Sequence, residues 1–318
     1  MKKVLVTGSS GFIGFHVVKK ILGKKISVVG VDNHNNYYSP RLKRFRLKIL
    51  KDNKKFKFYK LDISNKKKLI KLFKKERPNA VIHLAAQAGV RYSFENPGSY
   101  ISSNIMGTHN ILECMVECKI QKLIFASSSS VYGNQKKLPI TEKNPTNPLN
   151  FYGLTKLTNE KQIKLFNKNY NIDYIILRFF TAYGQIGRPD MFIPKLKKNI
   201  LKQIKVDLFN NGKHKRDFTF VEDISNIIEL LLRKKKFKEK FRILNVCSGI
   251  KTDIRKVVSL VENYLQKKAK LVPKGIQRGD MLETHGSNKN LKKYLNYSKF
   301  KNINYGIRQI FSDKYKKI

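Results

Sequence analysis

The segment Gly8-Ser9-Ser10-Gly11-Phe12-Ile13-Gly14 constrains the fold of this 318-residue chain more than any other part of the sequence. It stands between an apolar run from Lys3 to Thr7, which predicts a strand, and a run from Phe12 to Leu22, which predicts a helix. Glycines at this spacing allow a tight turn and let the backbone approach a pyrophosphate, whose charge meets the positive end of the helix. The segment therefore predicts a dinucleotide site.

An acidic residue follows where such a site needs one, because Asp32 ends the next predicted strand, Ile26 to Asp32. A carboxylate there accepts hydrogen bonds from both ribose hydroxyls and repels a 2′-phosphate, so the expected cofactor is NAD rather than NADP. The alternative is a structural turn followed by a cap at the strand end. The predicted cofactor contacts in this region are Gly8, Gly11, Phe12, Ile13, Gly14, Asp32 and Asn33.

Strands and helices alternate through the first half of the chain, and the strands are nearly continuous in apolar character. Further strands are expected over 56–62, 80–85, 122–127 and 173–180, and helices over 66–76, 100–118 and from 152 onward. This order predicts an α/β fold with a Rossmann-type, doubly wound parallel sheet. We expect residues 1–183 to form the NAD-binding domain and residues 184–318 to form mainly a smaller α/β substrate domain.

Two further strand ends carry expected cofactor contacts. Asp62 and Ile63 follow the third strand, where the alternative role for Asp62 is to cap the next helix. Small residues end the fourth strand and permit close approach of a cofactor. The contacts expected from these and one later strand are Asp62, Ile63, Leu84, Ala85, Ala86 and Phe179.

The chain is strongly basic, with 67 Lys and Arg against 22 Asp and Glu and a formal charge of +45. Most of the basic residues are lysines, and short lysine runs fall on predicted helix surfaces, so we expect a solvated coat rather than a nucleic-acid footprint. No apolar run is long enough for a membrane span or a signal peptide, so a cytoplasmic protein without nucleic-acid or membrane partners is expected. Cys114 and Cys118 are four residues apart on an apolar helix, and buried free thiols are expected there rather than a metal site.

The helix beginning near Tyr152 carries a candidate catalytic pair, because Tyr152 and Lys156 share one helix face. A phenol titrates near pH 10, so its use as a base at neutral pH requires a shift of about 3 units, or about 4 kcal/mol. One ammonium at about 4 Å in an effective dielectric of about 20 supplies an energy of that order. The alternative in so lysine-rich a chain is a solvated helix pair.

Four consecutive serines, Ser127 to Ser130, end the fifth predicted strand at the sheet edge that would face the nicotinamide. A hydroxyl there can share a proton with the sugar hydroxyl being oxidised and pass it to Tyr152. Taken singly, each of these serines is as consistent with a turn.

The glycine turn, the serine strand end and the Tyr/Lys helix, in this order, resemble the extended short-chain dehydrogenase/reductase superfamily over nearly the whole chain. Within it, four segments resemble those of UDP-glucuronate 4-epimerases, an NAD-dependent branch of the epimerase/dehydratase family. They begin at Gln87, Leu177, Gly187 and Arg216, and Gly187-Arg188-Pro189-Asp190-Met191 is the most specific of them.

The resemblance implies roles for individual residues. It makes Ser128, Tyr152 and Lys156 catalytic, with the last two also contacting NAD. It implies that Thr181 and Arg188 bind the sugar carboxylate and that Arg216 binds the diphosphate. The full set of expected substrate contacts is Gln87, Arg91, Ser128, Ser129, Thr181, Arg188, Arg216, Arg278 and Asp280. No metal site is expected, and a homodimer through the helices near 100–118 and 152–169 is implied.

The implied reaction is 4-epimerisation of UDP-glucuronate to UDP-galacturonate through a transient 4-keto sugar. Related dehydratases and decarboxylases carry an acid one or two positions after the catalytic hydroxyl, whereas this chain has Ser129 and Ser130. The alternatives are a 4-epimerase of UDP-glucose or a UDP-N-acetylhexosamine, a UDP-glucuronate decarboxylase, and a non-catalytic NAD-sensing or polyanion-binding protein. The chain departs from the epimerase pattern at Gln277-Arg278-Gly279-Asp280, where the family usually has Gln-Pro-Gly-Asp.

Overall fold

The computed structural model describes residues 2–276 and 281–312, which divide into two compact units. The first unit takes in the chain up to Gly133, residues 145–179 and residues 225–244. The second takes in residues 134–144, residues 180–224 and the chain from Asn245 onward. Each unit is described below by itself.

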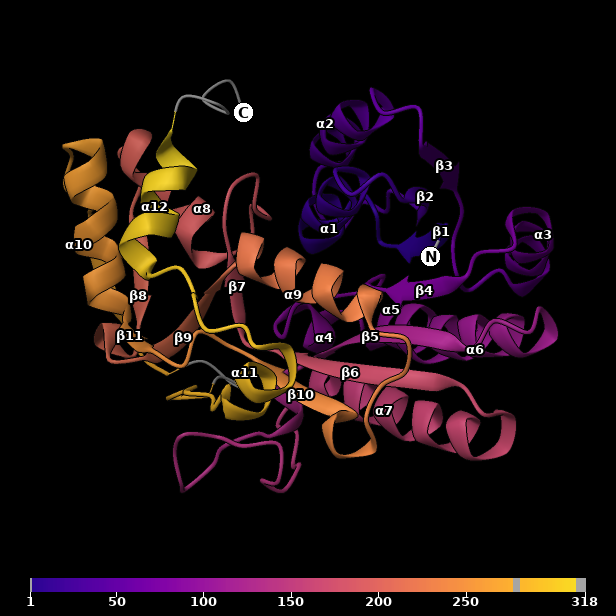
Figure 1. The fold of residues 1–318 in the computed structure, drawn as a ribbon. Coiled ribbons are helices and arrows are strands. Elements are labelled where there is room, and N and C mark those ends of the chain that lie inside the picture. The colour runs from indigo at the N-terminus through magenta and orange to yellow at the C-terminus, as the bar shows by residue number, and fades with distance from the viewer. Residues whose placement is uncertain (1, 277–280, 313–318) are drawn as a thin grey trace. The chain divides into compact units, whose positions relative to one another are not determined.

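A seven-stranded sheet with the order β10-β6-β5-β4-β1-β2-β3 is the framework of the first unit (Figure 1). Its strands are β1 (Lys3–Thr7), β2 (Ser27–Asp32), β3 (Phe56–Lys60), β4 (Ala80–His83), β5 (Lys122–Ser128), β6 (Asp173–Phe179) and β10 (Ile243–Val246). β1 pairs in parallel with both β2 and β4, and β5 pairs in parallel with both β4 and β6. The predicted doubly wound α/β class is therefore confirmed. Its topological switch point lies between β1 and β4, which is where such sheets bind ligands.

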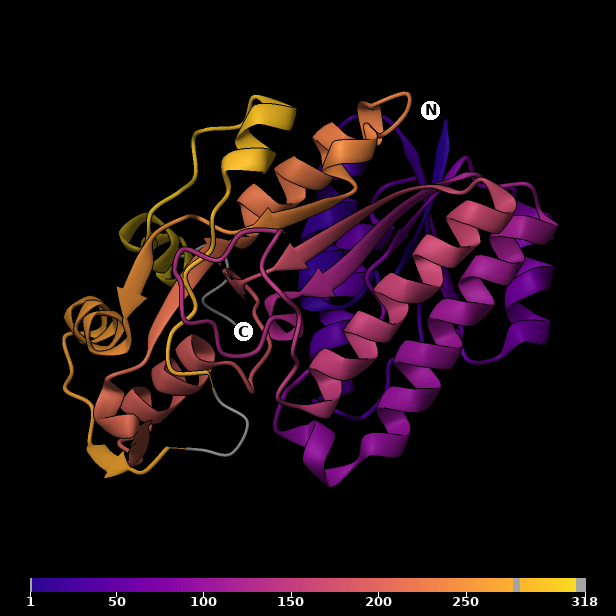
Figure 2. The ribbon, with the colours of Figure 1, turned by 90° about the horizontal axis from the view of Figure 1, so that it is seen from below.

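Helices cover both faces of this sheet (Figure 2). On one face lie α1 (Phe12–Leu22) and α2 (Pro40–Lys51), and on the other lie α3 (Lys66–Glu76), α6 (Gly107–Glu117) and α7 (Phe151–Tyr170). The remaining elements of this unit are α4 (Tyr92–Glu95), α5 (Pro97–Tyr100), η1 (Ile101–Met106), η2 (Ser129–Val131), η4 (Glu239–Phe241) and, from Ser225 onward, α9 (Val221–Arg233). α2 is missing from the sequence prediction, although Pro40 at its first turn is a usual start signal.

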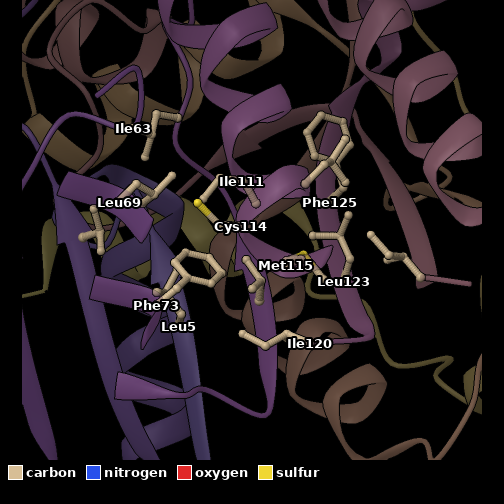
Figure 3. Close-up of a cluster of buried hydrophobic side chains, with 14 of the residues drawn as sticks. Leu5, Ile63, Leu69, Phe73, Ile111, Cys114, Met115, Ile120, Leu123 and Phe125 are labelled. Carbon is tan, nitrogen blue, oxygen red and sulfur yellow. The ribbon is translucent and has the colours of Figure 1, made fainter. Parts of the chain in front are cut away.

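The core between the sheet and the α3, α6 and α7 layer explains the apolar character of the strands (Figure 3). Leu5 and Leu123 from the sheet meet Phe73 of α3 and Met115 of α6, all with no exposed surface. Cys114 lies in the same cluster, and burial raises the pKa of its thiol to about 12. It therefore behaves as a small apolar side chain.

The long helix predicted over 100–118 is wrong in its first third. The structure has the short helix α5, then the π-helical segment η1, then α6. The wider turn accompanies an inward Asn104, whose amide binds the backbone of Gln87 and the hydroxyl of Thr155. These hydrogen bonds join residues that are far apart in the sequence, so the local apolar pattern could not indicate the π-helical segment.

The second unit contains two small sheets. One has the order β11-β9-β7, built from β7 (Thr181–Tyr183), β9 (Lys215–Phe220) and β11 (Lys251–Asp253), and the other pairs β8 (Val206–Phe209) with β12 (Leu271–Lys274). Around them are α8 (Phe192–Leu201), η3 (Asn210–Gly212), α10 (Ile254–Leu265), α11 (Lys289–Leu295) and α12 (Ile303–Phe311). α12 begins at Ile303 because Asn302 caps it by accepting from the Tyr305 N–H. Its apolar face packs against α8 and α10 in a separate core.

Among the residues that the structure describes, no helix is long and apolar enough to cross a membrane.

Candidate active site

The glycine turn after β1 forms a cradle that larger side chains would fill. Gly8 has a φ of +68°, and a Cβ there would lie 2.8 Å from the Ala85 nitrogen that follows β4. A Cβ on Gly14 would lie 1.9 Å from the Gly8 oxygen, so the first turn of α1 packs directly on the loop. Gly11, the N-cap, provides no side-chain cap, and the first turn of α1 holds no acidic residue. The N–H groups there and the helix dipole fit a pyrophosphate.

Asp32 is held in place at the end of β2. Its Oδ2 accepts from the Ser10 N–H at 3.1 Å and its Oδ1 accepts from the His34 N–H at 2.9 Å. The carboxylate is thereby fixed beside the glycine turn, where a ribose would lie in a dinucleotide fold.

Asp62 is not a helix cap, because Asn65 caps α3 by accepting from the Lys68 N–H at 3.0 Å. Its Oδ2 instead accepts from Asn33 Nδ2 at 2.7 Å. Burial alone would raise the pKa of Asp62, but the hydrogen bonds from Asn33 and Ser64 hold that pKa below its usual value. The structure therefore brings two predicted cofactor contacts, Asn33 and Asp62, together.

Lys43 lies on α2, the helix that the sequence analysis did not predict, and it was not among the residues expected near the cofactor. Its buried Nζ donates to the carbonyl and to the side-chain oxygen of Asn35, at 2.7 and 2.6 Å. Asn35 Nδ2 in turn donates to Gln87 Oε1 at 3.3 Å. The loop between β2 and α2 is thus tied to the segment after β4.

The segment after β4 is fixed at the switch point. Thr7 Oγ1 accepts from the N–H groups of Leu84 and Ala85, which joins the carboxyl ends of β1 and β4. Gln87 is buried, and its Nε2 has no hydrogen-bond partner among the described residues. A buried donor of this kind is costly unless a ligand or water accepts from it. Asn104, which binds both backbone groups of Gln87, is a second residue missed in the sequence.

Ser128 ends β5 and is buried, with 8% of its surface exposed. Its Oγ donates to Ser130 Oγ at 3.1 Å and accepts from the Ser130 N–H at 3.1 Å. α7 begins at Phe151 because Asn150 caps it by accepting from the Gly153 N–H. A Cβ on Gly153 would lie 2.5 Å from the Ser130 oxygen, so the first turn of α7 packs tightly on the serine segment.

Tyr152 lies in that first turn, and Lys156 follows one turn later on α7. The Tyr152 ring meets the Tyr100 ring edge-on, with centroids 6.2 Å apart. Lys156 Nζ donates to the Ala126 carbonyl at 2.7 Å and lies 5.0 Å from the centre of the Phe125 ring. Burial lowers the pKa of Lys156 to about 7, while the Glu160 carboxylate acts in the opposite direction. The structure therefore places Ser128 at the end of β5, and Tyr152 and Lys156 on α7, which packs against that strand end. The charge of the Lys156 ammonium is sensitive to its surroundings because it is buried.

The other predicted substrate contacts are spread over several segments. Arg91 is exposed just before α4, and Thr181 begins β7. Arg188 forms a two-point ion pair with Asp190, with Nε to Oδ1 at 3.1 Å and Nη2 to Oδ2 at 2.7 Å. Arg216 Nη1 donates to the carbonyls of Lys215 and Leu282. Arg278 and Asp280 lie outside the described residues.

Comparison with known proteins adds the following findings. Residues 4–247 match the model of the NAD dependent epimerase/dehydratase family. A Staphylococcus aureus protein named CapI is 40% identical, over 98% of this chain and 98% of that protein. The UDP-glucuronate 4-epimerase of Thermodesulfobacterium geofontis is 37% identical over 96% of this chain and 94% of that enzyme. The crystal structure of the UDP-glucuronic acid 4-epimerase from Bacillus cereus, in complex with UDP-glucuronic acid and NAD, superposes with a TM-score of 0.91 at 32% identity, covering 97% of this chain and 98% of that one.

Proposed function

Because this chain belongs to the NAD-dependent epimerase/dehydratase family, we propose that it epimerises UDP-glucuronate at carbon 4 to give UDP-galacturonate. The reaction is redox-neutral overall: carbon 4 is oxidised to a ketone and then reduced from the opposite face. The observation that carries the proposal is the end of β5, where Ser129 and Ser130 stand beside Ser128 in place of a carboxylic acid.

The NAD that this family uses fits the residues of the first unit. The pyrophosphate is proposed to bind the turn from Gly8 to Gly14, and the adenosine ribose is proposed to bind Asp32. When bound, NAD supplies the nicotinamide that accepts and returns the hydride. The bulk that a Cβ would introduce at Gly8 or Gly14 supports this assignment.

The chain's own residues handle the proton. Tyr152 is proposed to take the proton of the 4-hydroxyl as its phenolate and to return it at the end of the cycle. Ser128 shares the proton between sugar and phenol, since its Oγ lies at the strand end against which α7 packs. Lys156 stabilises the phenolate electrostatically, and burial makes its charge state sensitive to pH near neutrality.

A carboxylate next to the transient ketone creates a side reaction that the protein must suppress. The 4-keto sugar acid is a β-keto acid, which loses carbon dioxide when its carboxylate bond aligns with the ketone. We propose that Arg188 and Thr181 hold the carboxylate out of that alignment. The two-point contact of Arg188 with Asp190 supports this role, because it is the contact that a guanidinium makes with a carboxylate.

The experiment that tests the function is a product assay on the purified protein. UDP-glucuronate is expected to yield its 4-epimer, measured by chromatography and NMR, without net NADH absorbance or carbon dioxide. A UDP-pentose as the main product would establish a decarboxylase instead. Conversion of UDP-glucose or UDP-N-acetylglucosamine but not UDP-glucuronate would establish a neutral-sugar epimerase, and no conversion of any of them would favour a non-catalytic NAD protein.

Arg188→Ala is expected to raise the KM for UDP-glucuronate by about 10- to 100-fold, because a charged hydrogen bond contributes about 1.5–3 kcal/mol. Initial rates over a range of UDP-glucuronate concentrations measure it. Asp190→Asn is the control, since it keeps the guanidinium and removes its internal carboxylate partner, and its KM is expected to stay equal or fall. An unchanged KM in Arg188→Ala would contradict the carboxylate assignment.

We also propose that two copies of the chain pair through α6 and α7. Large apolar side chains are exposed on α7 and on η1, which leads into α6, with Leu154, Leu165, Ile101 and Met106 each at least 46% exposed. Exposed apolar groups gathered on neighbouring helices are typical of an interface.

Light scattering measures the molar mass in solution and is expected to give twice that of one chain. Leu165→Glu is expected to halve that mass, whereas Lys164→Glu, which changes an exposed position about 100° further round the same helix, is expected to leave it unchanged. A monomeric wild-type protein would overturn the pairing.

A further inference from the structure

Glu160 lies one turn beyond Lys156 on α7 and is almost completely buried, with 1% of its surface exposed. Its Oε1 accepts from Ser127 Oγ at 2.6 Å and from Arg178 Nε at 2.9 Å. Its Oε2 accepts from Arg178 Nη2 at 2.7 Å. A buried carboxylate with a two-point guanidinium partner and a hydroxyl donor is a strong and directional contact.

The partners of Glu160 lie directly before the predicted catalytic serine. Ser127 on β5 and Arg178 on β6 are opposite each other in the parallel register of these two strands. Lys156 binds the carbonyl of Ala126, the residue before Ser127. Successive turns of α7 therefore hold successive residues of β5, and the next residue along the strand is Ser128.

Glu160 also acts on the charge of Lys156. Desolvation disfavours the buried ammonium, and the Glu160 carboxylate opposes that effect. From β4, His83 faces Lys156 but carries no charge, because Thr7 Oγ1 accepts two backbone N–H groups and so donates to His83 Nδ1. Burial keeps the pKa of His83 at about 3.

The other groups around Glu160 are uncharged or already paired with it. The Arg178 guanidinium lies 4.6 Å from the centre of the Tyr132 ring. Tyr174 of β6, which interacts electrostatically with Glu160, has its pKa raised by burial and remains a neutral phenol at working pH. Glu160 is thus the carboxylate that offsets the desolvation of Lys156.

We infer that Glu160 is a positioning residue, which keeps Lys156 in its ammonium form and fixes the end of β5 that carries Ser128. The inference rests on the proposed function, in which the Lys156 ammonium lowers the pKa of the Tyr152 phenol. Loss of the Glu160 charge would shift the pair from phenolate plus ammonium toward phenol plus neutral amine.

The test is Glu160→Gln in the NAD-loaded protein, with the ionisation of Tyr152 read as the 295 nm absorbance difference from a matching Tyr152→Phe background. The Tyr152 pKa is expected to rise by about 1 unit or more. Loss of the Glu160 anion would by its direct effect lower the Tyr152 pKa. A rise in that pKa therefore shows that the loss acts through the charge of Lys156. A fall or an unchanged pKa would overturn the inference.

Activity gives the second reading: kcat is expected to fall about 10- to 100-fold, with KM changed less than about threefold. Ser127→Ala is the matched control, because it removes one hydrogen bond and keeps the Glu160 charge, and the Tyr152 pKa is expected to stay at its wild-type value. A shift of equal size in Ser127→Ala would assign the effect to loosened packing. In Glu160→Asp, which keeps the negative charge, the Tyr152 pKa is expected to stay close to its wild-type value.

Glu160→Gln leaves the Arg178 guanidinium buried without its carboxylate, which is strongly destabilising. If that variant does not fold, Glu160→Gln/Arg178→Met removes both charges together and is compared with Arg178→Met alone, so that only the Glu160 charge differs between the two proteins. The Tyr152 pKa is expected to be higher in the double variant. The phenol titration needs no sugar nucleotide. It therefore separates failure of this inference from failure of the proposed function, which the product assay on the wild-type protein decides.

Discussion

Tyr152→Phe is expected to lower the kcat for epimerisation by about 10³-fold, within the range of 10²- to 10⁴-fold typical of a positioned acid or base. The substitution removes only the phenolic oxygen. The ring that meets Tyr100 edge-on is kept, as is the cap of α7 by Asn150. The loss is therefore expected in kcat, with KM and bound NAD near their wild-type values. Rate assays on UDP-glucuronate and the NAD content of the purified protein measure the two effects.

Lys156→Met is the companion to that experiment. It removes the ammonium and the hydrogen bond to the Ala126 carbonyl, and it keeps an apolar chain of similar length. A rate in Tyr152→Phe above about a tenth of wild type would rule out the phenol as the general base. In that case Lys156 or Ser128 would have to carry the proton.

Gly14→Ala is expected to abolish retention of NAD and to lower the melting temperature by about 2–5 °C, from an overpacking energy of about 1–3 kcal/mol. The added Cβ would lie 1.9 Å from the Gly8 oxygen and 3.1 Å from the Ser9 Cα, all backbone atoms of the turn. The glycine loop and the first turn of α1 must move apart to make room for this Cβ. The N–H groups at the start of α1 would then no longer point at the pyrophosphate. Thermal denaturation and the absorbance of NAD released by acid measure the two outcomes.

Gly23→Ala provides the matched control at the other end of α1. Gly23 has a right-handed helical φ of −62°, and the nearest atom to an added Cβ is 3.4 Å away. Alanine there is expected to leave NAD content unchanged and stability equal or slightly raised. Full NAD content in Gly14→Ala would place the pyrophosphate elsewhere.

The large positive charge does not prevent several lysines from being structural. Lys43 binds Asn35, Lys156 binds Ala126, and Lys122 donates to the carbonyl of Leu232 near the end of α9. Burial lowers the pKa of Lys122 and of Lys156, and each finds backbone oxygen in place of water. Composition identifies a basic chain, but the individual roles of its lysines follow from their burial.

The residues of the candidate site also fall into those that the sequence indicates and those that only the packed structure reveals. Spacing along a strand, a turn and a helix is local, so the glycine turn, Asp32 and the Tyr152/Lys156 pair could be proposed as site residues from the chain. Asn104 and Glu160 were not, because each binds residues of other elements, and Lys43 was not, because its helix was not predicted. The partner of Arg188 is only two residues along the chain, yet spacing does not reveal the pair because a loop has no period.

The sequence by itself determined the order of the strands and of most of the helices that connect them, the glycine turn and hence the doubly wound class of the first unit. Apolar periodicity and glycine spacing encode these features locally. Only the tertiary structure decided that residues 101–106 form a π-helix, that Asp62 joins Asn33 and that Glu160 joins β5 to β6 through Arg178. The physical reason is that buried polar groups must find partners, and those partners exist only once separate elements have packed together.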